Sequence, residues 1–467
     1  MLIRFNVKNF LSFSERDNGM SEEFSMLAGK VRNKYTHLYD NGKIKLLKFA
    51  AIFGANASGK SNLVKAIDFM RTIVLYGLPK GHTEKYCKID EINKEKSSYF
   101  EMEIMIENRY YAYGFEIILN QSRFTSEWLF ELTSDNKEKL IFSRDIENGS
   151  YEFGESLKVK GLIDKLEVYA EDIQEDGSVL LLSMMNKNKK TLYQQYDRAK
   201  VFQNVYKWIS FGVDVNYPNS PISDYSYMAK TENVEEICRI ISAFGTGITG
   251  FKMVEVSPEK VLNNIPQNIK EDILSNIEKR VVRMKNNDNV QEIGIVMRSS
   301  KDFFILSVDK EENLTCKTIK FSHGDKKALF DISEESDGTI RILDLLEVLL
   351  SGEGKTYVID ELDRCLHPSL TYKFVSTFLQ LASKRNIQLI VTTHESRLMD
   401  FDLLRRDEIW FAAMNDNHES EIYSLYEFRQ EDNTRVKSTA AFDKQYLEGR
   451  YGADPYLSNM LTGRDWA

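Results

Sequence analysis

A short glycine-containing stretch near the N-terminus carries the clearest chemical signal in this chain. Phe53-Gly54-Ala55-Asn56-Ala57-Ser58-Gly59-Lys60-Ser61 contains the pattern G-x-x-x-x-G-K-[ST], in which the glycines let successive backbone N–H groups point inward. Lys60 supplies a positive charge, Ser61 can ligate Mg²⁺, and a helix that starts here faces the anion. We therefore expect Gly54 to Asn62 to bind the β- and γ-phosphates of a nucleotide.

A second segment ends in two adjacent carboxylates. Here an apolar strand pattern is followed directly by the two acids, in Tyr357-Val358-Ile359-Asp360-Glu361. Beside a phosphate loop, Asp360 can hold Mg²⁺ through a coordinated water, so Ser61 and Asp360 are the candidate metal ligands. Glu361 would point differently, toward the water that attacks the γ-phosphate, and could position or polarise that water.

A histidine follows another apolar strand. Gln388 to Thr393 has the composition of a buried parallel strand, and His394 closes it. A residue at the carboxyl end of such a strand lies on the ligand side of the sheet. His394 could donate a hydrogen bond to the γ-phosphate and so distinguish ATP from ADP, which makes Lys60, Glu361 and His394 the candidate catalytic residues.

A loop of small residues precedes a further helical pattern. Ser336-Asp337-Gly338-Thr339 stands before the amphipathic run that begins at Ile340. Such a loop at a helix start can bind an anion. On the residues alone, Ser336 could equally be a simple N-cap.

Hydrophobic periodicity places these motifs at both ends of an α/β chain. The first part predicts strand, phosphate loop and helix, then an antiparallel meander over residues 98–132, where apolar and acidic residues alternate. Helical spacing dominates from about 155 to 283, and strands return at 292–297, 303–308 and 315–321. We predict an N-terminal lobe (1–150), a mostly helical insertion (151–290) and a C-terminal lobe (291–467).

The composition and net charge argue against one class of protein, the general nucleic-acid binder. The 467 residues are 42% hydrophobic and carry a formal net charge of −9, which argues against a surface broadly committed to nucleic acid. Two basic sets are candidates for local contacts but are more simply solvated faces: Lys187-Asn188-Lys189-Lys190, and Lys279, Arg280, Arg283 and Lys285.

The cysteines and the apolar runs suggest a compartment. Cys87, Cys238, Cys316 and Cys365 form no C-x-x-C pair, so we expect reduced thiols. The sequence has no apolar run of about eighteen residues and no signal-peptide pattern. A cytoplasmic protein without a membrane partner is expected.

Together these segments resemble the ABC-type ATPases of the SMC, RecF and OLD group. The resemblance implies an ABC-type P-loop ATPase head with a mixed sheet, an antiparallel β flank and a helical insertion, acting on ATP with Mg²⁺. It also implies that ATP is sandwiched between two protomers, with Ser336 and Gly338 reaching the γ-phosphate of the opposite subunit. Leu362 to His367 would be the D-loop, in which Asp363 contacts nucleotide.

Some positions depart from the pattern of that group. His367, followed by Pro368, stands where an aspartate is typical, which looks more like RecF and OLD proteins than like transporters. Leu11 in Asn9-Phe10-Leu11-Ser12 replaces a frequent arginine, so a γ-phosphate contact expected there is in doubt. Glu127 is the candidate for the Q-loop residue.

The last quarter of the chain resembles a narrower group. Leu404-Arg405-Arg406-Asp407-Glu408-Ile409-Trp410-Phe411 and the segment from Tyr446 to Pro455 are similar to the compact ATPases of bacterial phage-defence operons, the RloA, AbiL and PARIS AriA type. That resemblance implies a homodimer or a higher assembly that senses infection. Its ATPase would control a separate operon-encoded effector, such as a TOPRIM-like nuclease, in response to a phage protein or DNA.

The residues leave a second function open. No acidic cluster able to build a two-metal nuclease follows His394, which favours an ATPase that regulates a separate effector. The alternative is a RecF- or SMC-like ATPase that binds DNA directly in repair, and a transporter subunit is a distant third.

Overall fold

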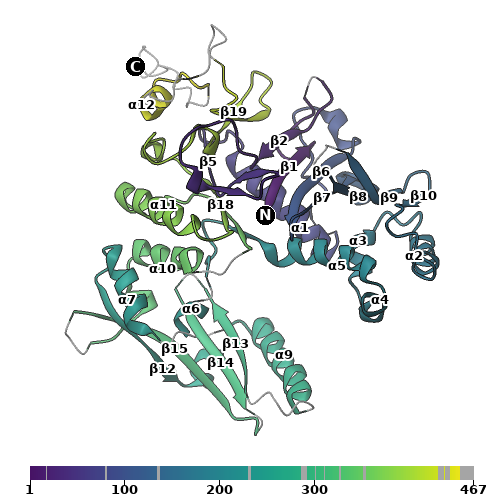
Figure 1. The fold of residues 1–467 in the computed structure, drawn as a ribbon. Helices are drawn as coiled ribbons and strands as arrows, with labels where there is room; N and C mark the ends of the chain where they lie inside the picture. The colour runs from purple at the N-terminus through teal and green to yellow at the C-terminus, as the bar shows by residue number, and fades with distance from the viewer. Residues whose placement is uncertain are drawn as a thin grey trace, which may run out of the picture. The chain divides into compact units, whose positions relative to one another are not determined.

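The computed structural model describes most of the chain as two compact units (Figure 1). The first comprises Met1–Val215, Gly352–Leu362 and Val375–Ala467, and the second comprises Asn216–Ser351 and Asp363–Phe374. The described residues are 1–16, 18–78, 81–133, 137–223, 225–229, 233–263, 265–285, 292–299, 301–309, 311–324, 328–350, 354–429, 436 and 442–452. Each unit is described below by itself.

A six-stranded mixed sheet forms the centre of the first unit. Its strands, in spatial order, are β11 (Val213–Asn216), β17 (Thr356–Ile359), β18 (Gln388–Thr392), β5 (Phe49–Phe53), β19 (Ile409–Met414) and β20 (Ser420–Ser424). The neighbours from β17 to β19 pair in parallel, and β20 pairs antiparallel with β19. Every residue of β17, β18 and β5 is buried, which confirms the buried parallel strand predicted from Gln388 onward.

Helix α1 (Lys60–Tyr76) begins directly after β5 and the glycine-containing loop. Leu63, Val64, Ile67 and Met70 recur at helical spacing and are buried, so this stripe packs the helix onto the unit. The other helices of the unit are α2 (Leu162–Glu171), α3 (Leu181–Met185), α4 (Lys190–Gln195), α5 (Lys200–Lys207) and α12 (Phe442–Leu447), and α11 (Pro368–Ala382) runs from the second unit into the first.

A seven-stranded antiparallel sheet forms the flank of the first unit. Its spatial order is β10 (Ser150–Phe153), β9 (Glu138–Asp145), β8 (Arg123–Leu132), β7 (Arg109–Ile118), β6 (Ser98–Ile106), β1 (Leu2–Lys8) and β2 (Glu22–Ser25). Strand β6 alternates buried and partly exposed residues over most of its length, as the meander predicted for 98–132 requires. A small hairpin of β3 (Leu38–Asp40) and β4 (Lys45–Leu47) is separate.

The side-chain amide of Gln388 joins this flank to the central sheet. Its Oε1 accepts the Leu2 N–H at 2.7 Å and the Thr356 hydroxyl at 3.0 Å, and its Nε2 donates to the carbonyls of Leu2 and Leu47 at 3.0 Å. Gln388 is completely buried, and these bonds satisfy the two donors and two acceptor sites of its amide. One side chain therefore links β18 with β1, β17 and β4.

Glu127 has a structural position inside the flank. Its carboxylate accepts the backbone N–H groups of Leu181 and Leu182 at 2.6 and 3.0 Å, pairs with Arg144 at 3.2 Å and accepts the Tyr113 hydroxyl at 3.1 Å. Burial raises the pKa of this carboxyl, and Arg144 opposes the shift. Both oxygens are used by these partners, so Glu127 anchors α3 to β8 and is not placed as a nucleotide-sensing residue.

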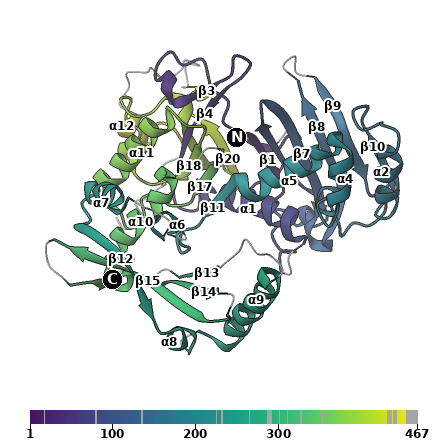
Figure 2. The ribbon, with the colours of Figure 1, turned by 60° about the horizontal axis from the view of Figure 1, so that its bottom comes forward.

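The second unit contains a sheet as well as helices. Strands β12 (Ile248–Val256), β15 (Leu314–His323), β14 (Phe303–Asp309) and β13 (Glu292–Arg298) follow one another in space, and β16 (Phe330–Asp331) pairs with β15. Figure 2 shows α9 (Gln267–Lys285) beside β13 and β14. The remaining helices are α6 (Ser226–Ala229), α7 (Val234–Ala243), α8 (Pro258–Asn263) and α10 (Asp337–Leu350).

These units cut the chain differently from the three parts expected at 1–150, 151–290 and 291–467. Residues 151–215 group with the first unit, and the second unit continues to Ser351. The reason is β12, which lies in the segment expected to be helical and pairs antiparallel with β15 along most of its length. That pairing ties the insertion to strands predicted for the C-terminal lobe.

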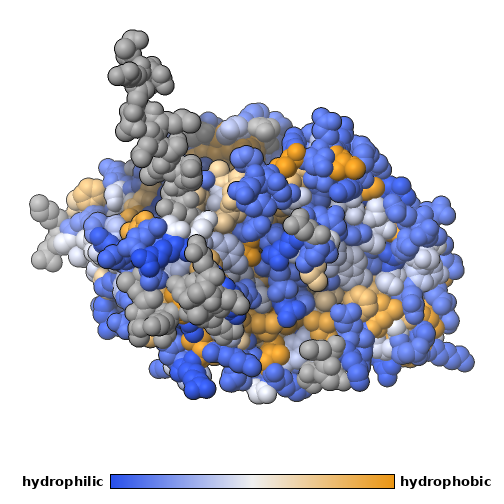
Figure 3. All heavy atoms as spheres, turned by 90° about the horizontal axis from the view of Figure 1, so that it is seen from above, coloured by the Kyte–Doolittle hydropathy of each residue, from blue (hydrophilic) through white to orange (hydrophobic). Residues whose placement is uncertain are grey.

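One face of the molecule is mostly polar, and the four cysteines are free thiols. Polar and charged side chains predominate on the face in Figure 3, with apolar groups between them. None of the helices in the described part of the chain is long and apolar enough to cross a membrane. Cys87, Cys238 and Cys316 are buried free thiols and Cys365 is an exposed one.

Two glutamates of β8 allow a test of the buried pair. Glu127→Ala should lower the free energy of unfolding by about 3–5 kcal/mol, because Arg144 would keep a buried charge without its carboxylate partner. Glu131→Ala is the matched control, since its partner Arg109 has a side chain that is 61% exposed, and it should cost at most about 1 kcal/mol. Urea unfolding followed by circular dichroism measures both. Equal losses in the two variants would contradict the structural role of Glu127.

Candidate functional site

The glycine-containing loop between β5 and α1 has a shape that side chains at two positions would prevent. Gly54 has φ +151° and Gly59 has φ +106°. A Cβ on Gly54 would lie 2.2 Å from the Ala412 carbonyl oxygen, and one on Gly59 would lie 2.2 Å from the Ser420 hydroxyl oxygen. The predicted need for glycine is thus met by backbone conformation and by close approach of β19 and β20.

Lys60 and Ser58 give this loop the polar groups that a phosphate requires. The Lys60 ammonium donates to the carbonyls of Gly54 and Ala55 at 2.8 Å each, which holds it over the loop. The Ser58 hydroxyl is buried and has no hydrogen-bond partner among the described residues. Asn56 and Ala57 at the tip are exposed. A curled backbone, a held ammonium and an orphaned hydroxyl fit a phosphate group.

Asp360 lies beside the first turn of α1, as predicted. Its Oδ1 accepts the Ser61 hydroxyl at 3.0 Å and the Thr392 hydroxyl at 2.6 Å. Parallel pairing explains this meeting, because Ile359 pairs with Val391 and Thr392 pairs with Ile52, so three strand ends share one edge. The two expected metal ligands are therefore within hydrogen-bond distance of each other.

This pair fits Mg²⁺ although it supplies only two protein groups. The described residues contain no cluster of three or more His, Cys, Asp or Glu side chains placed to hold a metal. Mg²⁺ is commonly held by one or two protein oxygens together with substrate phosphates and water. Ser61 and Asp360 match that kind of site.

Glu361 and His394 stand at the same edge of the sheet. Glu361 is half-buried and has a left-handed backbone (φ +50°), and its N–H donates to the Thr392 hydroxyl at 2.8 Å. His394 follows β18 by two residues and is exposed. The left-handed residue turns the chain immediately after Asp360, and the water-positioning role of Glu361 stays a prediction.

A serine pair absent from the expectations braces the loop. The Ser12 hydroxyl accepts the Asn62 amide N–H at 2.8 Å and lies 2.6 Å from the Ser420 hydroxyl. The Ser420 N–H also donates to the Ser12 carbonyl at 2.8 Å. Leu11, at the position of the expected arginine, has φ +53°. The Asn62 side chain thus braces the loop, and its contact with nucleotide stays a prediction. In the sequence, only the place of Ser12 beside Leu11 pointed to this brace, and nothing pointed to Ser420.

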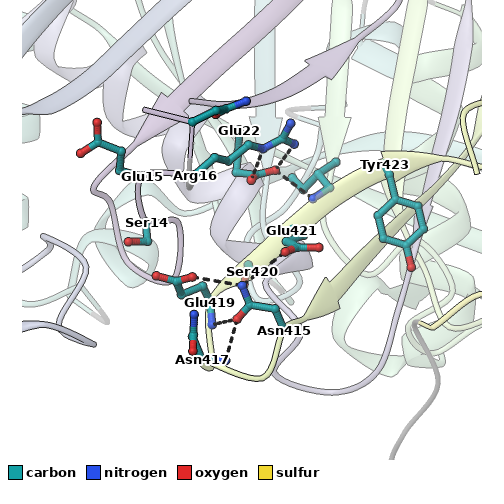
Figure 4. Close-up of a pocket in the computed structure, with 12 residues that line it drawn as sticks. Ser14, Glu15, Arg16, Glu22, Asn415, Asn417, Glu419, Ser420, Glu421 and Tyr423 are labelled. Carbon is teal, nitrogen blue, oxygen red and sulfur yellow. Dashed lines mark hydrogen bonds and ion pairs between the residues drawn. The ribbon is translucent and has the colours of Figure 1, made fainter. Parts of the chain in front are cut away.

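A cavity of about 400 Å³ includes Ser420 in its lining and so borders the loop (Figure 4). Arg16 donates to Glu22 at 2.6 and 2.7 Å, and this bonding raises the pKa of the guanidinium. Asn415 donates to Glu419 at 3.0 Å. The cavity is therefore lined by carboxylates and an amide that brace one another.

The expected signature and D-loop residues belong to the second unit. The Ser336 hydroxyl accepts the Thr339 N–H at 3.1 Å, which is the N-cap geometry considered as the simpler interpretation. A Cβ on Gly338 would lie 2.9 Å from the Cys365 carbonyl oxygen. The Asp363 carbonyl accepts the Leu366 N–H at 3.0 Å. Capping at Ser336 is confirmed, and its contact with nucleotide stays a prediction, as does that of Gly338 and Asp363.

His367 caps the next helix. Its Nδ1 accepts the Ser369 N–H at 3.2 Å, and its carbonyl accepts the Leu370 N–H at 2.8 Å. The residue that replaces an aspartate thus starts α11 ahead of Pro368, a favoured residue at the first helical position.

The C-terminal motif is a buried polar network. Arg405 donates to both carboxylate oxygens of Asp407 at 2.9 and 2.6 Å, and Asp407 accepts the Gly29 N–H at 2.8 Å. Glu408 lies 3.0 Å from His37 Nδ1, and burial raises the pKa of its carboxyl. These bonds tie residues 29–37 to the start of β19, so this part of the motif has a structural role.

The second half of that motif is described only in part. Tyr446 and Tyr451 pack on Phe411, with ring centroids 5.9 and 5.3 Å apart. Ala453 to Pro455 lie outside the described residues. The aromatic contacts attach α12 to β19.

The two basic sets differ in what can be said of them. Lys187 and Lys190 are exposed, and the Lys189 ammonium lies 3.5 Å from the centroid of the Tyr169 ring. The side chains of Lys279, Arg280, Arg283 and Lys285, on α9, lie outside the described part of the structure. Neither set is therefore assigned to nucleic acid.

Comparison with protein families gives a clear match. The family model described as "AAA domain, putative AbiEii toxin, Type IV TA system" matches residues 49–168 and 218–400, well over half of the chain. The chain belongs to this family. The first matched segment contains the phosphate loop, and the second contains Ser336, Asp360, Glu361 and His394. No curated protein matches the chain.

Several solved structures are similar at low identity. An SmcHead bound to the C-winged helix domain of ScpA is 17% identical, with a TM-score of 0.40 over 91% of this chain and 97% of that chain. The SMC head domain from Thermotoga maritima is 14% identical, with a TM-score of 0.35 over 91% and 98%. An Smc head domain bound to a ScpA domain from Pyrococcus furiosus is 15% identical, with a TM-score of 0.36 over 91% and 96%. The family match, and not these structures, identifies the AAA domain.

Alanine substitutions of Gly59 and Gly77, the glycines that flank α1, can separate the effect of the loop shape on ATP binding from the cost of backbone strain. Gly59→Ala should lower ATP affinity at least about tenfold, because the Cβ meets the Ser420 hydroxyl and the left-handed backbone disfavours alanine. Gly77→Ala is the matched control: its φ is +80° but nothing lies within 4 Å of the added Cβ. It should carry only the backbone cost, about 1–3 kcal/mol, because side chains rarely adopt φ +80° with ψ −165°, and it should leave ATP affinity unchanged. Calorimetric titration with ATP and thermal unfolding distinguish the two, and equal affinity losses would count against the close-approach explanation.

Proposed function

We propose that this AAA-domain protein binds and hydrolyses ATP with Mg²⁺. The observation that carries the proposal is the 3.0 Å contact between the Ser61 hydroxyl and Asp360 Oδ1 beside the glycine-shaped loop. A phosphate loop without a carboxylate at the next strand end could bind any anion. A loop with its serine paired to an aspartate suits a nucleotide whose phosphates share a metal ion.

Each residue has a role in this proposal. The loop N–H groups and Lys60 bind and orient the phosphates, and Ser61 and Asp360 hold Mg²⁺, which neutralises phosphate charge when bound. Glu361 positions the attacking water and can accept its proton. His394, exposed at the end of β18, donates to the γ-phosphate. Most of the acceleration would come from positioning and electrostatic stabilisation, as is usual in phosphoryl transfer.

The cavity beside Ser420 suits the nucleoside part of ATP. Its lining includes the carboxylates of Glu419 and Glu421, each of which accepts an N–H of the Asn415 amide and keeps further acceptor sites, while Glu22 is paired with Arg16. Carboxylates accept hydrogen bonds from hydroxyl and amino groups and repel further phosphate. The triphosphate would therefore occupy the loop, with the ribose and base toward this cavity.

A complete site would need two protomers. Ser336 and Asp337 are exposed at the start of α10, and Gly338 keeps that helix close to the D-loop. This exposure supports the proposal that Ser336, Gly338 and Asp363 contact ATP bound by a second subunit. ATP would then hold a homodimer together, and higher assemblies could form from such dimers.

We infer a role in anti-phage defence for this ATPase. Support comes from the family description, which names a toxin of a type IV TA system, and from the resemblance of the C-terminal motif to the RloA, AbiL and PARIS AriA type. In this role the protein is a cytoplasmic sensor or scaffold that controls a separate effector, such as a TOPRIM-like nuclease. The competing function is direct DNA binding in repair.

Two loop-edge variants test hydrolysis. Lys60→Ala should lose ATP binding, since it removes the positive charge held over the loop. Glu361→Gln should bind ATP and hydrolyse it about 100-fold or more slowly, because the amide cannot accept a proton from water. Phosphate release and equilibrium ATP binding measure the two steps separately. Near-normal turnover by Glu361→Gln would remove that residue from the catalytic role.

Mixing two inactive variants tests the composite site. Ser336→Asp keeps an N-cap acceptor for α10 but should repel the partner's γ-phosphate, so each protomer binds ATP without turnover. A one-to-one mixture with Lys60→Ala should regain about a quarter of wild-type activity, because random pairing gives half heterodimers with one intact site each. No recovery at any ratio would argue against sites shared between subunits.

Purification of the Glu361→Gln protein, which should stay bound to ATP because it hydrolyses ATP slowly, tests the biological role. Glu361→Gln protein should be isolated from cells that carry its native neighbouring genes, then analysed by mass spectrometry under native conditions. A stoichiometric effector encoded by a neighbouring gene supports the defence role and gives the size of the assembly. A partner-free dimer that carries DNA, with steep dependence of binding on salt, supports repair instead.

A further inference from the structure

We propose that Thr392 is a positioning residue that fixes both acidic residues of the site, Asp360 and Glu361, through one hydroxyl group. This inference rests on the proposed ATPase function and goes beyond it, since Thr392 itself touches neither nucleotide nor water in the proposal. The residue ends β18, the strand between β17 and β5, and is 1% exposed.

The hydroxyl of Thr392 has a defined direction. The Glu361 N–H donates to Thr392 Oγ1 at 2.8 Å, which makes this oxygen an acceptor on that side. Oγ1 also lies 2.6 Å from Asp360 Oδ1. Because an ionised carboxylate only accepts hydrogen bonds, the Thr392 hydroxyl proton must point at Asp360. One group therefore receives from one neighbour and donates to the other.

The bond to Asp360 bears on the expected metal site. Asp360 Oδ1 receives the hydroxyls of both Thr392 and Ser61. Two donors on one oxygen fix the plane of the carboxylate, since the side chain cannot rotate without losing both bonds. The second shell of a metal site commonly orients its ligands in this way. Thr392 would thus set how Asp360 faces Mg²⁺.

The bond to Glu361 bears on the water-positioning role. Glu361 has φ +50°, a left-handed conformation that non-glycine residues rarely adopt. Two bonds to one residue support it: the Glu361 N–H to Thr392 Oγ1, and the Leu362 N–H to the Thr392 carbonyl at 3.0 Å. Strained residues persist where their surroundings over-determine them. Without the hydroxyl, the bond between the Glu361 N–H and Thr392 Oγ1 is lost, and the left-handed backbone of Glu361 has less support.

Thr392→Val tests this because it keeps the shape of the side chain and removes the hydroxyl. Thr356→Val is the matched control: Thr356 is also buried, begins the adjacent strand β17 and donates to Gln388, away from both acids. Thr392→Ser restores the hydroxyl. The measurements are kcat and KM for ATP, ATP affinity with and without Mg²⁺, and Mn²⁺ binding to the ADP complex by electron paramagnetic resonance.

We expect Thr392→Val to lower kcat about 10- to 100-fold with little change in KM, and to weaken Mn²⁺ binding several-fold. ATP affinity without metal should stay unchanged. Thr392→Ser should lie within about threefold of wild type, and Thr356→Val should keep wild-type kcat and Mn²⁺ affinity. If valine prevents folding, Thr392→Ala is measured in the same way.

Wild-type kcat and Mn²⁺ affinity in a folded Thr392→Val or Thr392→Ala protein would overturn the proposal. Equal losses in Thr356→Val would also overturn it, because they would indicate a general effect of removing a buried hydroxyl. If the wild-type protein binds Mn²⁺ with ADP but does not hydrolyse ATP, the proposed function fails. The Mn²⁺ measurement then still decides whether Thr392 orients Asp360.

Discussion

The site depends on the parallel pairing of β17, β18 and β5. Parallel strands place their carboxyl ends at one edge of a sheet, and here those ends are followed by Asp360, by His394 and by the phosphate loop. A register shift of one residue would turn the side chains of a strand to the opposite face. All residues of these three strands are buried, so such a shift would disrupt close packing on both faces of the sheet.

Buried polar groups hold the remaining parts of the first unit to this sheet. Gln388 bonds to β1, β17 and β4 through one amide, and the network of Arg405, Asp407 and Glu408 holds residues 29–37. Such groups are costly to bury alone and specify one arrangement when fully bonded. The AAA domain thus uses apolar packing for its strands and fixed hydrogen bonds where distant segments meet.

Sequence patterns predicted the parts of the molecule that are local. The phosphate loop has a fixed spacing, and β17 and β18 are continuous apolar runs, so these patterns alone could place Lys60, Ser61, Asp360 and His394 at one edge. The brace between Ser12 and Ser420 joins residues 408 positions apart, and two serines leave no periodic signal. Thr392 lay inside a predicted strand, but its bonds depend on register. The same limit applies to the pairing of β12 with β15, which joins residues 248–256 to the sheet of the second unit.

The contacts of the loop glycines have a consequence for synthesis of the chain. Gly54 and Gly59 are translated long before the groups that press on them, Ala412 and Ser420. Contacts of such long sequence separation form late, because the chain must first close a large loop. A nascent chain on the ribosome would carry the whole phosphate-loop motif without the walls that shape it. Competence to bind nucleotide would therefore arise only after the segment that contains Ala412 and Ser420 has been synthesised.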